Sequence, residues 1–237
     1  ILLILFFYCG TLQSNDSQLW RQKASDMVKN QIEGRGIKDS AVIKAMRDTP
    51  RHLFIQDNLK DLAYNDGPLP IGEGQTISQP YIVALMTELL QLKGSETILE
   101  IGTGSGYQSA ILSTLVSDVY SIEIIHVLAD RATKTLNKLN YNNVIVKWGD
   151  GYKGWPKHAP FDGIIVTAAP EKIPQALIDQ LKIGGRLIIP VGSHYQQLKV
   201  IIKQSDGIKE ETIIPVRFVP MVHPQFPIPD SSYHKSQ

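Results

Sequence analysis

The sequence predicts an α/β fold in which helices cover both faces of a doubly wound, mostly parallel sheet. From Glu96 onward, short apolar runs of strand length alternate with longer segments of helical periodicity. This pattern indicates repeated strand–helix–strand units. The first of these strands leads straight into a glycine-rich turn that starts at Gly102, and a helix follows, as in many ligand-binding α/β sheets. The length of 237 residues lies within the range of one such domain.

The part of the chain before the first strand is predicted to be a helical extension. Apolar residues recur at helical spacing over 18–32 and 40–47, and Pro50 ends the second helix. The segment 65–79 is rich in Gly, Pro, Asn and Ser, which predicts a long loop, and such loops inside compact domains are often functional. Pro80 then suits the first turn of an apolar helix.

Strands and helices alternate through the rest of the chain. Apolar runs predict strands at 97–101, 119–124, 144–147, 164–167 and 187–191. Helical spacing predicts helices at 107–116, 126–139 and 174–181, and Gly184 and Gly185 would stop the last of these. Two final strands, 198–203 and 212–218, flank Ser205-Asp206-Gly207 and predict a C-terminal hairpin. Residues 18–222 are therefore expected to form one domain, and the tail 223–237 is predicted to be disordered.

The first 17 residues are set apart from the fold because they begin with an unbroken apolar run over 1–8. Eight residues cannot cross a bilayer, which takes about 20. The run fits the apolar part of a secretory signal, but a lipid anchor at Cys9 and a leader without a role remain alternatives. Contact with a membrane is expected only if this leader is retained.

Composition excludes several classes of protein. The net charge of +1 gives no reason to expect nucleic acid or an anionic membrane as a partner. Cys9 is the single cysteine, which excludes an internal disulfide and a cysteine-based zinc cluster. The six histidines are scattered without metal-ligand spacing, so no metal site is predicted.

The sharpest local signal is the turn that contains Gly102, Gly104 and Gly106. Glycines let a backbone turn tightly and approach a ligand closely, and the following helix N-terminus favours a polar group. Tyr107 stands where a dinucleotide fingerprint has its third glycine, which argues against NAD or FAD, and no P-loop lysine follows. A glycine-rich turn without any ligand is the plainer alternative.

Acidic residues at the ends of successive strands favour an adenosine-type cofactor. Glu123 ends the second strand, where a carboxylate can accept both hydroxyls of a ribose. Asp150, between Gly149 and Gly151, follows the third strand and could accept from an adenine amino group. Glu100 is placed beside the positively charged methionine end of such a cofactor, and a strand-end acid that faces solvent is its alternative.

These motifs, with several others, resemble the protein-L-isoaspartate O-methyltransferase family over residues 18–222. The similar segments are 50–54, 72–80, 100–107, 149–151, 161–170, 184–192 and 216–222. Of these, Gln75-Thr-Ile-Ser-Gln-Pro80 is the most discriminating. The resemblance implies a class I methyltransferase fold and S-adenosylmethionine as cofactor. It further implies that the substrates are age-damaged proteins with isoaspartyl or D-aspartyl residues, whose methyl esters proceed to succinimides. A monomer in the cytoplasm is expected, with export as the alternative if the leader is a signal.

The resemblance also implies roles for individual residues. Ser78 carries over as the active-site residue, with Gln79 beside it. Cofactor-binding roles carry over to Thr76, Ile77, Glu100, Gly102, Gly104, Gly106, Glu123, Asp150 and Gly151. From the residues alone, Ser78 could instead be the N-cap of the helix at Pro80. A carboxylate is ionised at neutral pH and needs no general base, so a loop of hydroxyls and N–H groups suffices to position it.

Two rival functions remain open at this point. A small-molecule methyltransferase of the same fold would keep the glycine turn and Glu123 but would use a different acceptor. A non-catalytic cofactor-binding or interaction module would bind without turnover, and the intact Ser78 loop argues against it.

Overall fold

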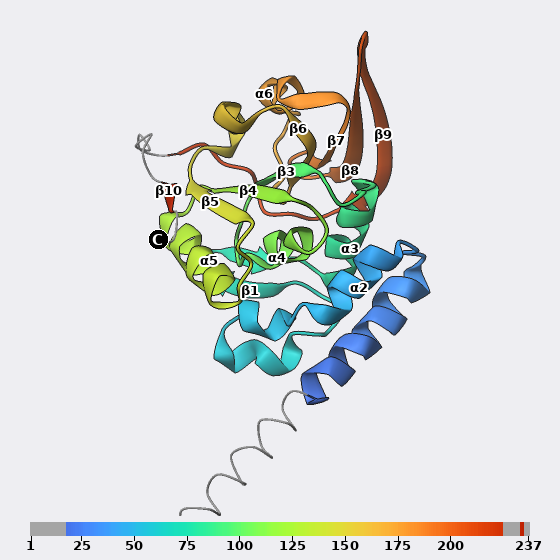
Figure 1. The fold of residues 1–237 in the computed structure, drawn as a ribbon, viewed down its shortest axis with the longest axis vertical. Coiled ribbons are helices and arrows are strands. Elements are labelled where there is room, and N and C mark those ends of the chain that lie inside the picture. Colours follow the sequence, from blue (N-terminus) through green and yellow to red (C-terminus); the bar gives the residue numbers. More distant parts are fainter. Residues whose placement is uncertain (1–17, 225–232, 235–237) are drawn as a thin grey trace, which may run out of the picture.

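A computed structural model describes residues 18–224 and 233–234, which form an eight-stranded sheet flanked by helices (Figure 1). The leader 1–17 and most of the tail therefore lie outside the described residues. The sheet order is β10-β5-β4-β3-β6-β7-β8-β9. The strands are β3 (Thr97–Ile101), β4 (Asp118–Glu123), β5 (Val144–Trp148), β6 (Phe161–Val166), β7 (Leu181–Val191), β8 (Gln196–Gln204), β9 (Gly207–Val216) and β10 (Tyr233–His234).

The central strands confirm the predicted parallel sheet. β5, β4, β3, β6 and β7 run parallel, whereas β8, β9 and β10 each pair antiparallel with their neighbours. The β8–β9 hairpin, predicted from the turn signal around Asp206, extends beyond the rest of the sheet (Figure 1).

The helices lie where the periodicity predicts them. The α-helices after the N-terminal segment are α2 (Ser40–Asp48), α3 (Pro80–Leu89), α4 (Tyr107–Ser113), α5 (His126–Lys138) and α6 (Gln175–Asp179). A helix over 18–27 continues through the π-helical η1 (Val28–Ile32) and the 3₁₀ turn η2 (Glu33–Arg35), and this segment packs beside α2 and α3 (Figure 1). Short 3₁₀ helices are η3 (Arg51–Phe54), η4 (Asp57–Leu62), η5 (Gly151–Lys153) and η6 (Pro156–His158). None of the described helices is both long and apolar enough to cross a bilayer.

Two hydrophobic cores sandwich the sheet because successive side chains of a strand point to opposite faces. Ile98 belongs to the core that contains residues of α3, α4 and α5. Its neighbour Leu99 belongs to the other core, with Leu177 of α6. Burial on both faces explains why the central strands read as continuous apolar runs.

The predicted loop 65–79 is wrong in part, because it contains a β-hairpin. β1 (Leu69–Gly72) pairs antiparallel with β2 (Gln75–Ile77). Gly72, Glu73 and Gly74 have φ of 91°, 54° and 69°, so the residues that indicated a loop are those of a tight turn. Strands of 4 and 3 residues are too short to show an apolar alternation.

The predicted end of the last helix is also wrong. α6 ends at Asp179, and β7 begins at Leu181, so the two glycines lie inside a strand. Pairing of Phe161 with Leu181 is followed by Gly163 with Arg186, so β7 bulges between these pairs. A side chain at Gly185 would come within 2.9 Å of the Asp162 carbonyl. The glycines therefore serve this bulge and do not cap a helix.

The strand order reverses at β3, and this reversal places the site. The chain adds β4 and β5 on one side of β3, then returns to add β6 and β7 on the other. Crossover segments leave β3 and β6 on opposite faces, which opens a crevice at their carboxyl ends. Gly102 follows β3 and Thr167 follows β6 at this point.

Candidate active site

Three adjoining cavities open at the carboxyl ends of β3, β4 and β6. The first, with an empty volume of about 630 Å³ including its open mouth, is lined by the glycine turn, Glu123, Gly151 and the segment Val219–Val222. The second is lined by Ile77, Ser78 and Tyr107, among others. The third lies between Ser78, Gln79 and the segment Pro215–Val219. Thr76 and Thr167 line all three, so the cavities meet at these two threonines.

The glycine turn is held against β6 by Thr167. The Thr167 hydroxyl donates to the Gly102 carbonyl oxygen at 2.6 Å. A β-carbon at Gly102 would lie 2.4 Å from that hydroxyl, and the φ of Gly102 is 96°. Both facts require glycine. Gly104 lines the first and second cavities, whereas Gly106 packs on Leu136 of α5, so its role is close helix packing.

Glu123 presents a nearly buried carboxylate to the first cavity. Its Oε2 accepts from the Gly104 N–H at 2.8 Å, and its Oε1 accepts from the Ile125 N–H at 2.9 Å. Burial raises the pKa of Glu123, and the backbone N–H groups oppose that shift. Each oxygen keeps a free lone pair, so the carboxylate can accept from two neighbouring hydroxyls of a ligand.

Gly151 lines the first cavity, whereas Asp150 lies beside it. The Asp150 carboxylate accepts from the Tyr152 N–H at 3.0 Å and begins η5. A β-carbon at Gly151 would lie 2.3 Å from a methyl group of Ile101, so the wall of the cavity requires glycine there. The Asp150 side chain is not among the residues that line the cavity.

Glu100 lies elsewhere than the sequence predicts. Its carboxylate is fully buried, accepts from the hydroxyls of Ser109 and Ser121, and lines none of the three cavities. Strand alternation turns Glu100 toward α4, which carries Ser109, whereas the cavities open beyond the end of β3. The predicted direct contact with a cofactor therefore finds no support, and neither does the alternative of a solvent-facing acid. Burial raises the pKa of Glu100 to about 7.

The Ser78 hydroxyl is available to a ligand. The N-cap of α3 is Gln79, without a side-chain cap, so the alternative that Ser78 caps this helix is wrong. Ser78 is half-buried and lines the second and third cavities. No hydrogen bond of its hydroxyl is found within the described part of the chain, whereas its carbonyl oxygen accepts from Arg51 Nη2 at 2.7 Å.

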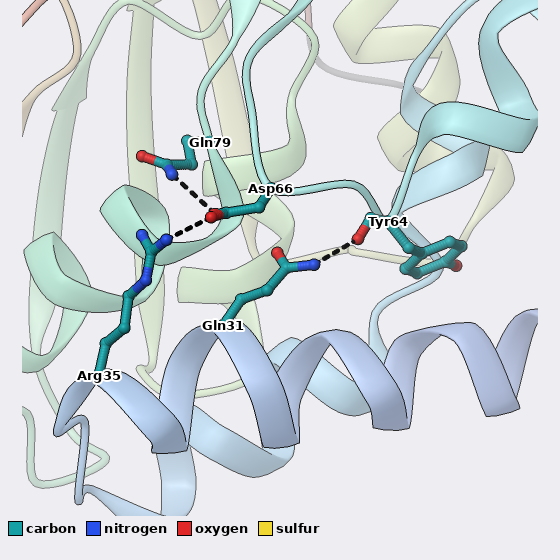
Figure 2. Close-up of polar contacts among 5 residues, drawn as sticks. All are labelled: Gln31, Arg35, Tyr64, Asp66 and Gln79. Atoms are coloured by element: carbon teal, nitrogen blue, oxygen red, sulfur yellow. Dashed lines mark hydrogen bonds and ion pairs between the residues drawn. The ribbon is translucent and has the colours of Figure 1, made fainter.

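The N-terminal helical segment braces the residue that follows Ser78. Asp66 lies between Arg35 and Gln79 and binds both, as Figure 2 shows. Its Oδ1 accepts from Gln79 Nε2 at 2.7 Å, and Arg35 pairs with its other oxygen. Gln31, one turn earlier, donates to the Tyr64 carbonyl oxygen at 2.8 Å (Figure 2). Gln79 therefore lines the third cavity with its side-chain amide group fixed by Asp66.

Sequence reasoning assigned no role to several residues that line the cavities. Thr167 directly follows β6, which pairs with β3, and Glu123 became a candidate because it lies at a similar strand end. Met221 belongs to a distant segment that hydrogen bonds to Ala169 through both Val219 and Met221, each at 2.8 Å. The Tyr152 hydroxyl donates to the Met221 carbonyl oxygen at 3.0 Å. No local pattern could place this segment, because its position depends on pairing across the fold.

The donors and walls of the first cavity suit an adenosyl group. The Glu123 carboxylate can accept from a ribose diol, and Ile122, Ile124 and Met221 offer apolar surface to a flat base. Among the described residues, no group of three His, Cys, Asp or Glu could hold a metal ion; independence from metal stays a prediction.

Comparison with known proteins decides which adenosyl-binding family this is. A model of the protein-L-isoaspartate (D-aspartate) O-methyltransferase family matches residues 22–225. The chain belongs to this family. The predicted resemblance is thereby confirmed, together with the class I methyltransferase fold.

Relatives of known family support the same assignment. Protein-L-isoaspartate O-methyltransferase 2 of Shewanella sediminis is 52% identical over 225 residues, which is 93% of this chain and 92% of that protein. Protein-L-isoaspartate O-methyltransferase 1 of Syntrophobacter fumaroxidans is 56% identical over 203 residues, 85% of this chain and 95% of that protein.

Solved structures of family members share the fold. One protein-L-isoaspartate O-methyltransferase superposes with a TM-score of 0.77 at 30% identity and covers 84% of this chain and 65% of the other. A second, from Plasmodium falciparum in complex with S-adenosyl-L-homocysteine, has a TM-score of 0.74 at 26% identity and covers 84% and 98%.

Membership makes the chain a methyltransferase with S-adenosylmethionine as its methyl donor. The acceptor of the family is the free α-carboxylate of isoaspartyl residues in damaged proteins, and the methyl ester formed is the first step of their repair.

Proposed function

We propose that this protein-L-isoaspartate O-methyltransferase holds the acceptor carboxylate where the three cavities meet. One observation carries the proposal: Thr76 and Thr167 line all three cavities, and Ser78 lines the second and third. An acceptor bound there reaches both the donor side and the peptide side of the site.

The first and second cavities would hold the methyl donor. S-adenosylmethionine supplies, when bound, an electrophilic methyl group on a positively charged sulfur. Glu123 would accept from the ribose hydroxyls, with Gly151 and Met221 as walls around the base. Thr76, Ile77, Gly102 and Gly104 line the second cavity, toward the methyl group. Glu100, Gly106 and Asp150 would support this shell from behind or beside it.

The third cavity would hold the damaged peptide. Its walls are the Ser78–Gln79 segment on one side and Pro215–Val219 on the other. Ser78 and Thr76 would donate to the carboxylate oxygens and orient them. The acceptor is ionised near neutral pH and needs no base, so the residues mainly align it. Alignment of this kind is worth roughly 7–11 kcal/mol in favourable cases.

Transfer of labelled methyl to an isoaspartyl peptide and to its aspartyl twin tests the proposal. An aspartyl residue carries its carboxylate one methylene further out, and such misplacement costs on the order of 100-fold in rate. We expect the isoaspartyl peptide to be methylated and the twin to be nearly inert. Equal rates on the two peptides would contradict the proposed acceptor. A small-molecule methyltransferase would leave both peptides unmodified.

We also propose that residues 18–222 are the catalytic unit, which acts as a cytoplasmic monomer without a nucleic-acid partner. The low net charge and the family resemblance support this. Export remains the alternative, and the leader that would decide it lies outside the described residues. Light scattering of the full-length protein tests the monomeric state, and cell fractionation tests the location. A dimer, or a protein recovered outside the cytosol, would contradict them.

A further inference from the structure

Arg51 is a fully buried arginine that binds the main chain of the Ser78–Gln79 segment, called here the acceptor loop. Its Nε donates to the Ala63 carbonyl oxygen and its Nη2 to the Ser78 carbonyl oxygen, each at 2.7 Å. The guanidinium group also lies 4.9 Å from the centre of the Tyr107 ring. Ser78 and Tyr107 both line the second cavity, so Arg51 joins two parts of its wall.

The charge of Arg51 has no acidic partner among its described contacts, which are two carbonyl oxygens and the side chains of Tyr64 and Tyr107. Its third nitrogen, Nη1, is buried without a hydrogen-bond partner in this part of the chain. Burial lowers the pKa of Arg51 to about 10, so the group stays protonated at neutral pH. Burying a charge without a counter-ion is costly, and functional sites are where such groups concentrate.

We propose that Arg51 is the fixed counter-charge for the acceptor carboxylate and the positioning residue for Ser78. The inference rests on the proposed function, because it needs an anion in the second and third cavities. The charge of Arg51 and its hydrogen bond to Ser78 act on different steps. The positive charge attracts the carboxylate on binding, but methyl transfer neutralises that carboxylate against the sulfonium. The charge therefore favours the bound acceptor more than the transition state, so its removal weakens peptide binding and does not by itself lower turnover.

The hydrogen bond to the Ser78 carbonyl acts on turnover instead, because it sets where the Ser78 hydroxyl stands. Arg51→Lys keeps the charge but cannot span both carbonyl groups. Arg51→Gln removes the charge. Neither Arg51 nor Arg186 lines a cavity itself, but Arg51 binds the cavity residue Ser78. Arg186 is therefore the control, since its Nε donates at 2.6 Å to the carbonyl oxygen of Leu89, which lines none of the three cavities.

The decisive measurement compares an isoaspartyl peptide with a twin whose α-carboxylate is a carboxamide, by binding calorimetry in the presence of S-adenosylhomocysteine. We expect wild type to bind the carboxylate peptide more tightly than its carboxamide twin. In Arg51→Gln this ratio of affinities should fall about tenfold. Arg51→Lys should keep the preference while its kcat falls, and Arg186→Lys and Arg186→Gln should change neither. A folded Arg51→Gln variant with the wild-type preference would overturn the counter-charge.

A salt titration of wild type keeps the proposal testable if Arg51→Gln does not fold. Arg217 lines the third cavity and is exposed, so its attraction would be screened by salt, whereas that of a buried charge would not. We expect the affinity for the isoaspartyl peptide to change little with salt. A steep loss would assign the counter-charge to Arg217. If wild type binds the isoaspartyl peptide no better than its aspartyl twin, the proposed acceptor itself fails, whatever Arg51 does.

Discussion

At the scale of single residues, Ser78 is the position on which the proposed acceptor site depends. Its hydroxyl is not used as an N-cap, and its carbonyl group is held by Arg51. The Ser78 hydroxyl and the Ser78 carbonyl group therefore have separate roles. An alanine at this position removes the hydroxyl but keeps the carbonyl group that binds Arg51.

Ser78→Ala should therefore lower turnover on the isoaspartyl peptide by roughly 10- to 100-fold, because the carboxylate loses an orienting donor. Cofactor affinity and melting temperature should stay close to wild type. Steady-state kinetics and calorimetry with S-adenosylhomocysteine measure both. Ser40→Ala, on the exposed first residue of α2, is the control. Normal turnover in Ser78→Ala would remove Ser78 from the mechanism.

Glu100 shows how burial changes what an acidic residue does. Its pKa is raised to about 7, first by desolvation. Between its ordinary value and about 7, the folded state holds a proton that the unfolded state has lost. Stability contributed by this group is therefore present at low pH and lost as pH rises through this window.

Glu100→Gln should remove that loss, because an amide can still bind Ser109 and Ser121 without a charge. We expect the variant to gain stability over wild type between about pH 5 and 8, by on the order of 3 kcal/mol at most. Urea unfolding at several pH values measures the gain. A stability difference from wild type that is the same at every pH would mean that folding does not shift the pKa of Glu100. Weakened cofactor binding would instead restore the contact predicted from sequence.

At the scale of elements, Asp66 connects the N-terminal helical segment to the acceptor loop. It binds Arg35 of the helical segment and Gln79 of the loop (Figure 2). The Arg35–Asp66 pair is partly exposed, with 41% and 34% of the two side chains accessible. Such pairs contribute at most about 1 kcal/mol to stability. We therefore attribute the main role of Asp66 to its hydrogen bond with Gln79.

Asp66→Ala should accordingly lower stability little but raise the KM for the peptide on the order of 10-fold, because Gln79 is no longer held in the third cavity. The matched control is Asp48→Ala, which removes a surface ion pair with Lys44 on α2. Kinetics and thermal unfolding of both variants give the comparison. Equal KM values in the two variants would show that the brace has no bearing on the acceptor.

At the scale of the whole molecule, the first cavity, the proposed cofactor site, is assembled from segments distant in sequence. Thr76, Gly102, Glu123, Gly151 and Met221 line it together. Unfolding any of these segments would destroy the cavity. A ligand that binds there must therefore stabilise all of these segments together.

S-adenosylhomocysteine at 100 times its Kd should therefore raise the free energy of unfolding by about 2.7 kcal/mol in a single transition. Glu123→Gln should need more ligand for the same shift, because charge-assisted hydrogen bonds contribute roughly 1.5–3 kcal/mol. Glu210→Gln, in an ion pair on the distal hairpin, should behave as wild type. An undiminished shift in Glu123→Gln would reject the ribose role.

The order of strands and helices follows from the sequence because it depends on local patterns. Apolar runs such as 97–101 and the periodicity of α5 can be recognised from neighbouring residues alone. The glycines after β3 predict a turn, and in the structure they have positive φ. The family motif around Ser78 likewise lies in one stretch of chain. These features were predicted correctly.

What the sequence could not determine is which side chains share a space. Glu100 and Ile101 are adjacent, yet the pleat sends one to Ser109 and the other to the cavity. The bulge at Gly185 depends on the pairing of β7 with β6, whose residues lie earlier in the chain. Thr167, Met221 and Arg51 reach the site through contacts 65, 52 and 27 residues away in the chain. Such contacts form only when the sheet is assembled, because their partners are fixed by packing across the fold and not by neighbours in sequence.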